Sequence, residues 1–344
     1  MHYPPALPVS HPPGQLNPAW IVAALLCFSS SVIGQEIGLS APVRIESGVS
    51  GHIHPALCIS TKGTLVATFC KKEFMPHLIT RSTDGGKTWS APMQFPPTDK
   101  VAVYPGSLTT LSDGRLLHCW NVWFAPEEKV KSRYVAFSLS SDDGLTWSAP
   151  VNLAKNADPK IHSVIRHPIV ELSPTSWLLP LADRTVLYNP QTGKETSFGD
   201  GTSHGLVPFV RTPAGTLISG KGQRSTDGGK TWQPIKPFPD VSTQGWRHEM
   251  MSLNNGWLLA SHIIGSGVGG DVIHFVVSRD DGQTWDLEHP VEFYNPGRPI
   301  GGRACPRTVE INDATLGTIY YDTDEKQPGG SGVFFRTMKT AGLK

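Results

Sequence analysis

The chain has 344 residues, with 30 basic and 29 acidic side chains and a formal net charge of +1. This balance gives no field that attracts a polyanion, and no basic patch with interleaved aromatic residues indicates nucleic-acid binding. The 35 glycines and 30 prolines are spread evenly, apolar runs are short, and no long stretch has a 3.6-residue period. This pattern predicts many short strands joined by turns.

The first 34 residues contain no Asp, Glu, Lys or Arg and include the apolar run WIVAALLCF, Trp20 to Phe28. Such a run suits the core of a signal peptide and is shorter than the about 20 residues that span a bilayer. A disordered, proline-rich leader is the alternative. We expect residues 1–34 to be a signal peptide and residues 35–344 to form one domain. The mature protein is then secreted or periplasmic, without stable membrane insertion.

Four cysteines follow this leader: Cys58, Cys70, Cys119 and Cys305. An even number in an exported protein permits disulfides, and the three possible pairings stay open. None of the four lies in a CxxC motif, and His-Ile-His at 52–54 is the one pattern that places two imidazoles on one strand face. We expect no metal and no cofactor.

A second feature is a hairpin unit that occurs six times after the leader, each with an alternating apolar strand, a two-residue turn and another apolar strand. The last turn residues are Gly63, Gly114, Thr175, Gly215, Gly256 and Ala314. Their spacing averages about 50 residues, which with four strands per unit is typical of a β-propeller blade. The sixth unit lacks one strand, which residues 41–47 near the N-terminus can supply.

A ten-residue phrase recurs at 81–90, 139–148, 224–233 and 277–286, always as Ser-x-Asp-x-Gly-x-Thr-Trp. Its aspartates are Asp84, Asp142, Asp227 and Asp280. The Asp can accept backbone N–H bonds within its own turn, the Gly permits positive φ, and the Trp can pack into the adjacent seam. The phrase is therefore interpreted as a structural part of the blade.

These phrases are Asp-boxes, and with six hairpin units the chain resembles the sialidase superfamily along its whole length after the leader. The resemblance implies an all-β, six-bladed propeller of four-stranded antiparallel blades, closed by an N-terminal strand that completes the last blade. It also implies a site remote from the boxes. In that family three arginines hold the substrate carboxylate, a Tyr–Glu pair is the nucleophile and an Asp is the acid/base.

The sequence departs from the family at three of these places. Ile53 stands where the first arginine is expected. Glu73 is the only carboxylate where the acid/base Asp is expected. Cys305 stands at the position of the tyrosine. These departures put ordinary sialidase chemistry in doubt and direct attention to the other residues of the inner strands.

Side chains nine and eleven residues before each turn share one face of the innermost strand, and in a closed ring they converge on one pocket. They include three arginines, Arg166, Arg247 and Arg303. Because a guanidinium group matches a carboxylate or sulfate, we interpret these arginines as a clamp for an acidic sugar. The alternative is that they form structural pairs with Glu249, Glu171 or Asp183.

Histidines occupy the same face at His52, His54 and His204. Because imidazole titrates near neutral pH, His54 and His204 are candidate acids or bases, together with Glu73. His52 and Tyr104 are candidate contacts to the substrate. The preferred hypothesis is an exported glycoside hydrolase that acts on a sialic acid- or uronate-containing glycan. The alternatives are a polysaccharide lyase, with His and Tyr acting while Arg neutralises a uronate, and a non-catalytic glycan-binding propeller.

Overall fold

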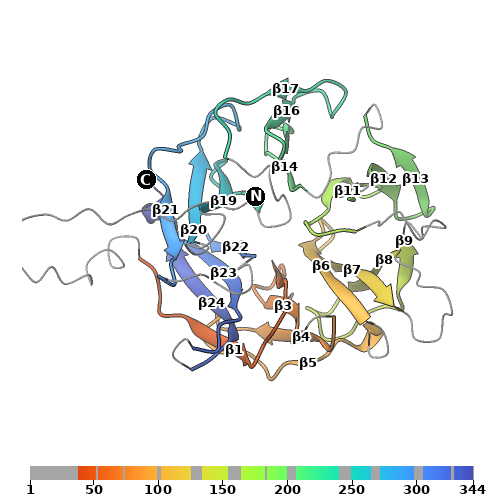
Figure 1. The fold of residues 1–344 in the computed structure, drawn as a ribbon. Helices are drawn as coiled ribbons and strands as arrows, with labels where there is room; N and C mark the ends of the chain where they lie inside the picture. Colours follow the sequence, from red (N-terminus) through yellow and green to blue (C-terminus); the bar gives the residue numbers. More distant parts are fainter. Residues whose placement is uncertain are drawn as a thin grey trace, which may run out of the picture.

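The computed structural model describes residues 38–51, 53–72, 74–98, 102–124, 134–153, 164–182, 184–199, 207–239, 249–264, 272–297, 305–326 and 329–343. These residues form six four-stranded antiparallel sheets and contain no α-helix. The sheets are arranged as blades around a common axis (Figure 1), so the predicted six-bladed propeller is confirmed. The predicted leader, residues 1–34, lies outside the described residues.

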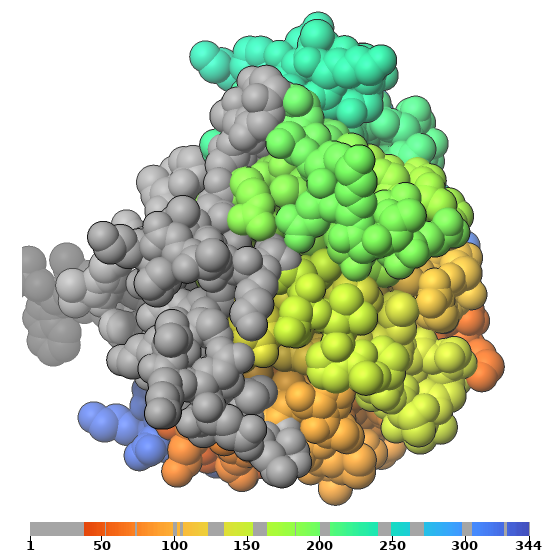
Figure 2. Space-filling view, turned by 90° about the vertical axis from the view of Figure 1, so that its right-hand side faces the viewer, coloured from red at the N-terminus to blue at the C-terminus, as the bar shows by residue number. Residues whose placement is uncertain are grey.

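The first three blades follow one another along the chain, each running from its innermost to its outermost strand. Blade one consists of β2 (Ala56–Ile59), β3 (Leu65–Cys70), β4 (His77–Ser82) and β5 (Met93–Gln94), followed by the 3₁₀ turn η1 (Pro96–Thr98). Blade two consists of β6 (Ala102–Thr110), β7 (Leu116–Phe124), β8 (Tyr134–Ser140) and β9 (Val151–Leu153). Blade three consists of β10 (Val170–Ser173), β11 (Ser176–Pro180), β12 (Thr185–Asn189) and β13 (Lys194–Ser197). Seen from the side, blades one to four succeed one another from orange to teal (Figure 2).

The last three blades repeat this order until the ring closes. Blade four consists of β14 (Phe209–Arg211), β15 (Leu217–Ser219), β16 (Gln223–Ser225) and β17 (Gln233–Pro234). Blade five consists of β18 (Met250–Ser252), β19 (Leu258–Ile264), β20 (Val272–Ser278) and β21 (Val291–Tyr294). Blade six consists of β22 (Arg307–Asn312), β23 (Thr315–Asp322), β24 (Gly332–Lys339) and β1 (Val43–Ser47), and the chain continues into η3 (Thr340–Gly342).

The ring is closed by the N-terminal strand β1, which pairs with β24 at the edge of blade six. Val43 lies opposite Phe335, and Ser47 lies opposite Gly332. This pairing confirms the expected completion of the last blade by an N-terminal strand. It also joins the N-terminal and C-terminal parts of the propeller by backbone hydrogen bonds within one blade.

Inner strands and second strands are joined by short turns, four of which use a glycine at positive φ. At Gly63 φ is 83°, and the glycine N–H donates to the Ser60 carbonyl at 2.9 Å. Gly114, Gly215 and Gly256 repeat this geometry. Blades three and six have Thr175 and Ala314 instead, and there the inner strand is irregular just before the turn. The hairpin units recognised in the sequence are thus the inner pairs of the blades.

Each Asp-box closes on itself through hydrogen bonds within one turn. In the first box the Thr88 hydroxyl donates to Asp84 Oδ2 at 2.6 Å, while the Thr88 N–H and the Ser82 hydroxyl donate to Oδ1. These bonds, led by the Thr88 hydroxyl, lower the pKa of Asp84 to about 2. Asp142, Asp227 and Asp280 have the same set of donors.

The Asp-boxes also lie against the preceding blade of the ring. The Trp89 ring of blade one packs edge-on against Phe335 of blade six, with centroids 5.3 Å apart. A Cβ atom placed on Gly86 would lie 2.0 Å from the Phe335 ring. Glycine is therefore required there for close approach as well as for its φ of 88°. The box thus fastens a turn and fills a seam between blades.

The core lies between blades, and both faces of a middle strand are therefore buried. All six residues of β3 are buried because its two faces pack against neighbouring blades. The four described cysteines, Cys58, Cys70, Cys119 and Cys305, are buried free thiols in this structure. Burial raises the pKa of Cys58 and Cys119 to about 12. These thiols are interior packing groups here, and the disulfides that the even count permitted are not formed.

Candidate functional site

The innermost strands surround the propeller axis, and adjacent ones are in contact, as β2 is with β6 and β22. Labels of inner strands β6, β14 and β22 lie near the centre of Figure 1, with β5, β9, β17 and β21 at the periphery. We call the end at which the inner strands begin the leading end, and the opposite end the turn end. Residues nine before a turn lie at the leading end, and those seven before it lie one level deeper.

Arg166 connects three blades at the leading end. Its Nη2 donates a hydrogen bond to Nδ1 of His54 and lies 4.0 Å from Sγ of Cys305. His54 precedes β2 of blade one, and Cys305 precedes β22 of blade six, whereas Arg166 belongs to blade three. All three side chains are buried, with Arg166 only 1% exposed. The guanidinium group therefore reaches across the axis and forms a floor at this end of the channel.

The backbone is strained at two of these residues. His54 has φ of 39° and Cys305 has φ of 32°, in the left-handed region that non-glycine residues rarely adopt. Such conformations cost about 1–3 kcal/mol each and cluster at binding and active sites. Because an arginine only donates, His54 must accept at Nδ1, so its neutral ring carries the proton on Nε2. This tautomer has a proton to give from its other nitrogen.

Arg307 and Glu249 form a second level directly beneath this floor. Arg307 Nη2 donates to the Arg166 carbonyl at 2.9 Å, and its Nη1 donates to the Pro306 carbonyl at 2.9 Å. Glu249 Oε1 accepts the Thr308 N–H at 2.7 Å. Both side chains are buried. Arg307 thus holds the backbone that carries Arg166, and Glu249 holds the strand that carries Arg307.

Burial perturbs both charged groups of this second level. It raises the pKa of Glu249 to about 7, although the Arg307 charge and the Thr308 N–H oppose the shift. Burial also lowers the pKa of Arg307, against the favourable charge of Glu249. Near neutral pH, the buried Arg307 guanidinium group therefore lies beside a carboxyl group that is only partly ionised.

Of the residues proposed from the sequence, the structure brings His54 and Arg166 together, with Cys305 beside them. The backbone of Tyr104 lies in β6 opposite Asn121. Five others lie outside the described residues: His52, Glu73, His204, Arg247 and Arg303. The anticipated clamp of three arginines is therefore represented here by Arg166 alone.

Two residues of the second level were missed as site candidates. Glu249 and Arg307 each lie seven residues before their turn, two positions beyond the His54 and Arg166 level on the same strand face. The alternation that selected positions nine and eleven could have selected them too. Glu249 was considered only as a partner for arginines, and the structure couples it to Arg307. Glu171, a second suggested partner, accepts hydrogen bonds from Ser112 at the turn end, and Asp183, the third, lies outside the described residues.

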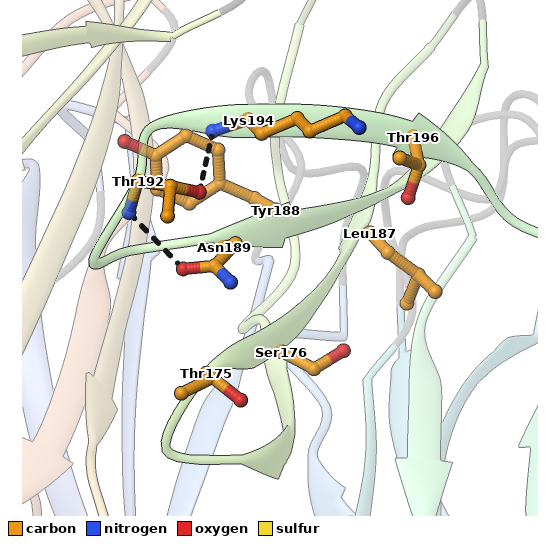
Figure 3. Close-up of a pocket in the computed structure, with 8 residues that line it drawn as sticks. All are labelled: Thr175, Ser176, Leu187, Tyr188, Asn189, Thr192, Lys194 and Thr196. Carbon is orange, nitrogen blue, oxygen red and sulfur yellow. Dashed lines mark hydrogen bonds between the residues drawn. The ribbon is translucent and has the colours of Figure 1, made fainter.

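A separate hollow of about 200 Å³ lies on blade three, where a plain hairpin replaces the Asp-box. Figure 3 shows Tyr188, Asn189, Thr192 and Lys194 around the β12–β13 turn. The Thr192 N–H donates to Asn189 Oδ1 at 3.1 Å, which fastens this turn. Among the described residues that line the hollow, Lys194 is the only charged one. It lacks the combination of arginine, histidine and carboxyl groups found on the axis.

The described residues contain no group of three His, Cys, Asp or Glu side chains placed to hold a metal ion. In the same part of the chain, no helix has the length and apolar character needed to cross a membrane.

Comparison with known proteins shows what these features are similar to. The model of the BNR/Asp-box repeat matches residues 80–91 and 223–234. A curated sialidase of Bacteroides fragilis (strain YCH46) is 24% identical over 299 residues, which cover 78% of this chain and 48% of that protein. The chain thus spans about half the length of this relative.

Solved structures share the fold. The Hadza microbial sialidase Hz136 matches with a TM-score of 0.63 and 15% identity, covering 85% of this chain and 66% of that one. The α-L-arabinanase of Penicillium chrysogenum, complexed with arabinobiose, matches with a TM-score of 0.60 and 16% identity, covering 88% and 98%. At these identities the likeness concerns the fold, which is one that glycoside hydrolases use.

Proposed function

Because this chain belongs to the sialidase superfamily of Asp-box propellers, we propose that it is an exported glycoside hydrolase that acts on an acidic glycan. The observation that carries the proposal is the leading-end floor, where buried Arg166 lies against His54 and above buried Arg307. The carboxylate of a sialic acid or uronate is an anion that a guanidinium group matches in shape and charge.

Arg166 is proposed to orient the acidic group of the substrate from beneath. His54 is proposed to donate a hydrogen bond from Nε2 to the glycosidic oxygen, because its hydrogen bond from Arg166 leaves the proton on Nε2. Such a bond stabilises the negative charge that develops on the departing oxygen. The group that transfers the proton to this oxygen is left unassigned. Arg247, Arg303, His52, His204, Glu73 and Tyr104 remain proposals for the rest of the site. The nucleophile is left unassigned.

The lyase alternative needs a base that removes a proton beside a uronate carboxylate. His54 does not suit this role, because its Nδ1 accepts a hydrogen bond from Arg166 and its Nε2 already carries a proton. The hydrolase is therefore the better supported of the two. The arabinanase neighbour adds neutral arabinosides to the substrates that merit testing.

The proposal is tested with the purified chain on chromogenic α-sialosides, uronides and α-L-arabinofuranosides, and on uronate polymers monitored for an ultraviolet-absorbing double bond. We expect release of an acidic sugar without formation of that double bond. Absorbance growth on uronate polymers would establish the lyase instead. Calorimetric binding of an acidic glycan without turnover would establish the binding propeller.

Two pairs of variants locate the activity. Arg166→Lys keeps the charge but loses the planar fork, and we expect kcat/KM to fall about 100-fold, mainly through KM. His54→Gln should lower kcat by about 100-fold or more with little change in KM. The matched controls are Arg115→Lys, at the turn between β6 and β7, and His289→Gln, on the loop before β21; both side chains are exposed. Equal effects in a variant and its control would refute the assignment of the site.

Export is proposed from the first 34 residues, which lie outside the described part of the chain. Expression of the full chain in a bacterium followed by N-terminal sequencing of the mature product tests it. A new N-terminus close to Gln35 supports cleavage after the apolar run. An intact N-terminus on protein retained inside the cell would contradict export.

A further inference from the structure

The turn end of the channel holds a cavity of about 830 Å³, bounded by residues from the inner strands of all six blades. His54, Arg166 and Cys305 do not line it, so it is separate from the leading-end floor. Its volume falls within the range of about 300–1,000 Å³ that is typical of small-molecule sites. The two ends of the axis therefore present two different environments.

Glu249 lies at the inner end of this cavity, and its side chain is incompletely satisfied. The residue is 6% exposed and lines the cavity. Oε1 accepts the Thr308 N–H, whereas Oε2 is buried with no hydrogen-bond partner among the described residues. An unmatched buried carboxyl oxygen costs about 1–3 kcal/mol or more. Because Glu249 lines the cavity, a ligand that enters from the turn end can supply the missing donor if the carboxyl group rotates toward it.

Between Glu249 and the mouth, the wall is largely apolar. Four apolar side chains lie at one level, five residues before their turns, and we call this the valine level: Val170, Val210, Met251 and Val309. One residue nearer the mouth, Glu171 and Glu310 accept N–H groups of Ser112 and Asn254 on the preceding blades. At about 3.3 Å per residue, three residues separate the level of Glu249 from this rim by roughly 10 Å. Carboxyl groups thus lie at both ends of an apolar wall.

The charge of the cavity favours a cation. Its lining contains three acidic residues, Glu171, Glu249 and Glu310, and one basic residue, Arg211. Arg211 Nη1 donates to the Leu172 carbonyl, which fixes it at the edge. Within the described residues these carboxyl groups do not form a three-ligand metal cluster. The apolar wall between these carboxyl groups fits an organic cation with an apolar body.

From this arrangement we infer that the turn-end cavity is a binding site for an aliphatic diamine. One ammonium group donates to the carboxyl group of Glu249, the methylene chain contacts the valine level, and the second ammonium group lies beside the rim carboxylate of Glu310. Each ammonium group then gains a charge-assisted hydrogen bond, and the chain buries apolar area. The site is independent of the glycan proposal, because it lies on the other side of the Arg166 floor.

Calorimetric titration of the purified full chain with 1,5-diaminopentane at pH 8 tests the site. The comparison ligands are 1-aminopentane, which keeps one charge, and 1,5-pentanediol, which keeps the length without charge. We expect the diamine to bind about tenfold more tightly than the monoamine, and the diol to give no saturable heat. Equal binding of diamine and diol, or no binding of the diamine, would show that the cavity holds only water.

Variants identify the contacts. Glu249→Gln is expected to weaken diamine binding about tenfold or more, and Glu310→Gln about threefold, since the rim is more hydrated. Glu288→Gln, on an exposed loop of blade five, is the matched control and should leave binding unchanged. Circular dichroism establishes that each variant is folded. If Glu249→Gln does not fold, Met251→Phe, which narrows the valine level, must weaken binding by a similar factor.

The pH dependence supplies a second readout. The groups that face the Glu249 side chain are Arg307 and the Thr308 N–H on β22. The backbone N–H of Glu249 donates to the Ser261 hydroxyl of β19. Because burial raises the pKa of Glu249 to about 7, diamine binding should strengthen from pH 6 to pH 8 as the carboxylate forms. Glu249→Gln should remove most of this dependence. If Glu249→Gln binds the diamine as tightly as the parent chain at both pH values, the proposed site is wrong.

Discussion

The Asp-boxes on the outer rim of the propeller and the cluster on its axis both depend on hydrogen bonds of polar side chains, but they form these bonds in opposite ways. On the rim, Asp84 receives its hydrogen bonds from Ser82 and Thr88, within seven residues of chain. On the axis, Arg166 bonds to His54, 112 residues away, and Arg307 bonds to Arg166, 141 residues away. The rim unit is therefore complete by itself, whereas the axial cluster exists only after the ring has closed.

This difference explains why one pattern repeats and the other does not. A self-contained turn can serve any blade, so the same eight-residue pattern occurs in four of them. An axial side chain meets partners from other blades and has a different neighbourhood in each. Repetition therefore marks scaffold in this molecule, and the unrepeated residues on the inner strands are the ones available for function.

The largest expected effect is on stability, and it should differ between the two glycines of the first Asp-box. Gly86→Ala should lower the free energy of unfolding by about 3 kcal/mol or more, because its Cβ would lie 2.0 Å from the Phe335 ring in addition to the strain at φ of 88°. Gly85→Ala has strain at φ of 73° but no atom within 4 Å, so about 1–2 kcal/mol is expected. Urea denaturation measures both. Equal losses would show that the box does not depend on close contact with the preceding blade.

The axial cluster should instead make the free energy of unfolding depend on pH. In the unfolded chain Glu249 has its ordinary pKa of 4.5, and in the folded protein burial raises it to about 7. Between these values the folded state binds more protons, so stability falls as pH rises from about 4.5 to about 7 and is level above it. The shift corresponds to a loss of up to about 3 kcal/mol.

Glu249→Gln removes this titration, and its unfolding free energy should lose that slope between pH 4.5 and 7. Urea denaturation across this range compares the variant with the parent chain. Glu288→Gln is the control, since its side chain is exposed. If the unfolding free energy of Glu249→Gln still falls between pH 4.5 and 7 as it does in the parent chain, other groups cause the pH dependence.

The fold was predictable because its signals are local. Each hairpin turn, such as that at Gly63, and each Asp-box, such as that at Asp84, is written in consecutive residues. Their spacing then gives the number of blades, and the shortage of one strand in the sixth unit indicates the closure by β1. The structure adds the registers and the seam contacts, which depend on packing between blades.

The site was predictable only in part. Alternation along the inner strands predicts that His54 and Arg166 share one face, and the structure brings the two side chains into contact. It did not reveal that Arg166 crosses the axis or that Arg307 supports its carbonyl, because both contacts connect residues more than 100 positions apart. Glu249 was overlooked because its environment, a buried position beside Arg307, is set by two blades together.

The smallest expected effect returns to the rim and has the opposite pH sign. Donors from Thr88 and Ser82 lower the pKa of Asp84 to about 2, so the box stabilises the fold fully above the ordinary pKa of 3.8 and loses this contribution as pH falls through about 2. Asp84→Asn should therefore lower the urea midpoint at pH 7, and the difference from the parent should shrink by pH 2.5. The effect is smaller than at Gly86 because the carboxylate is exposed to solvent, which screens it. Asp142→Asn should behave alike, since its pKa is also lowered to about 2. A constant deficit across pH in both variants would show that the boxes act through shape alone, without the charge of their aspartates.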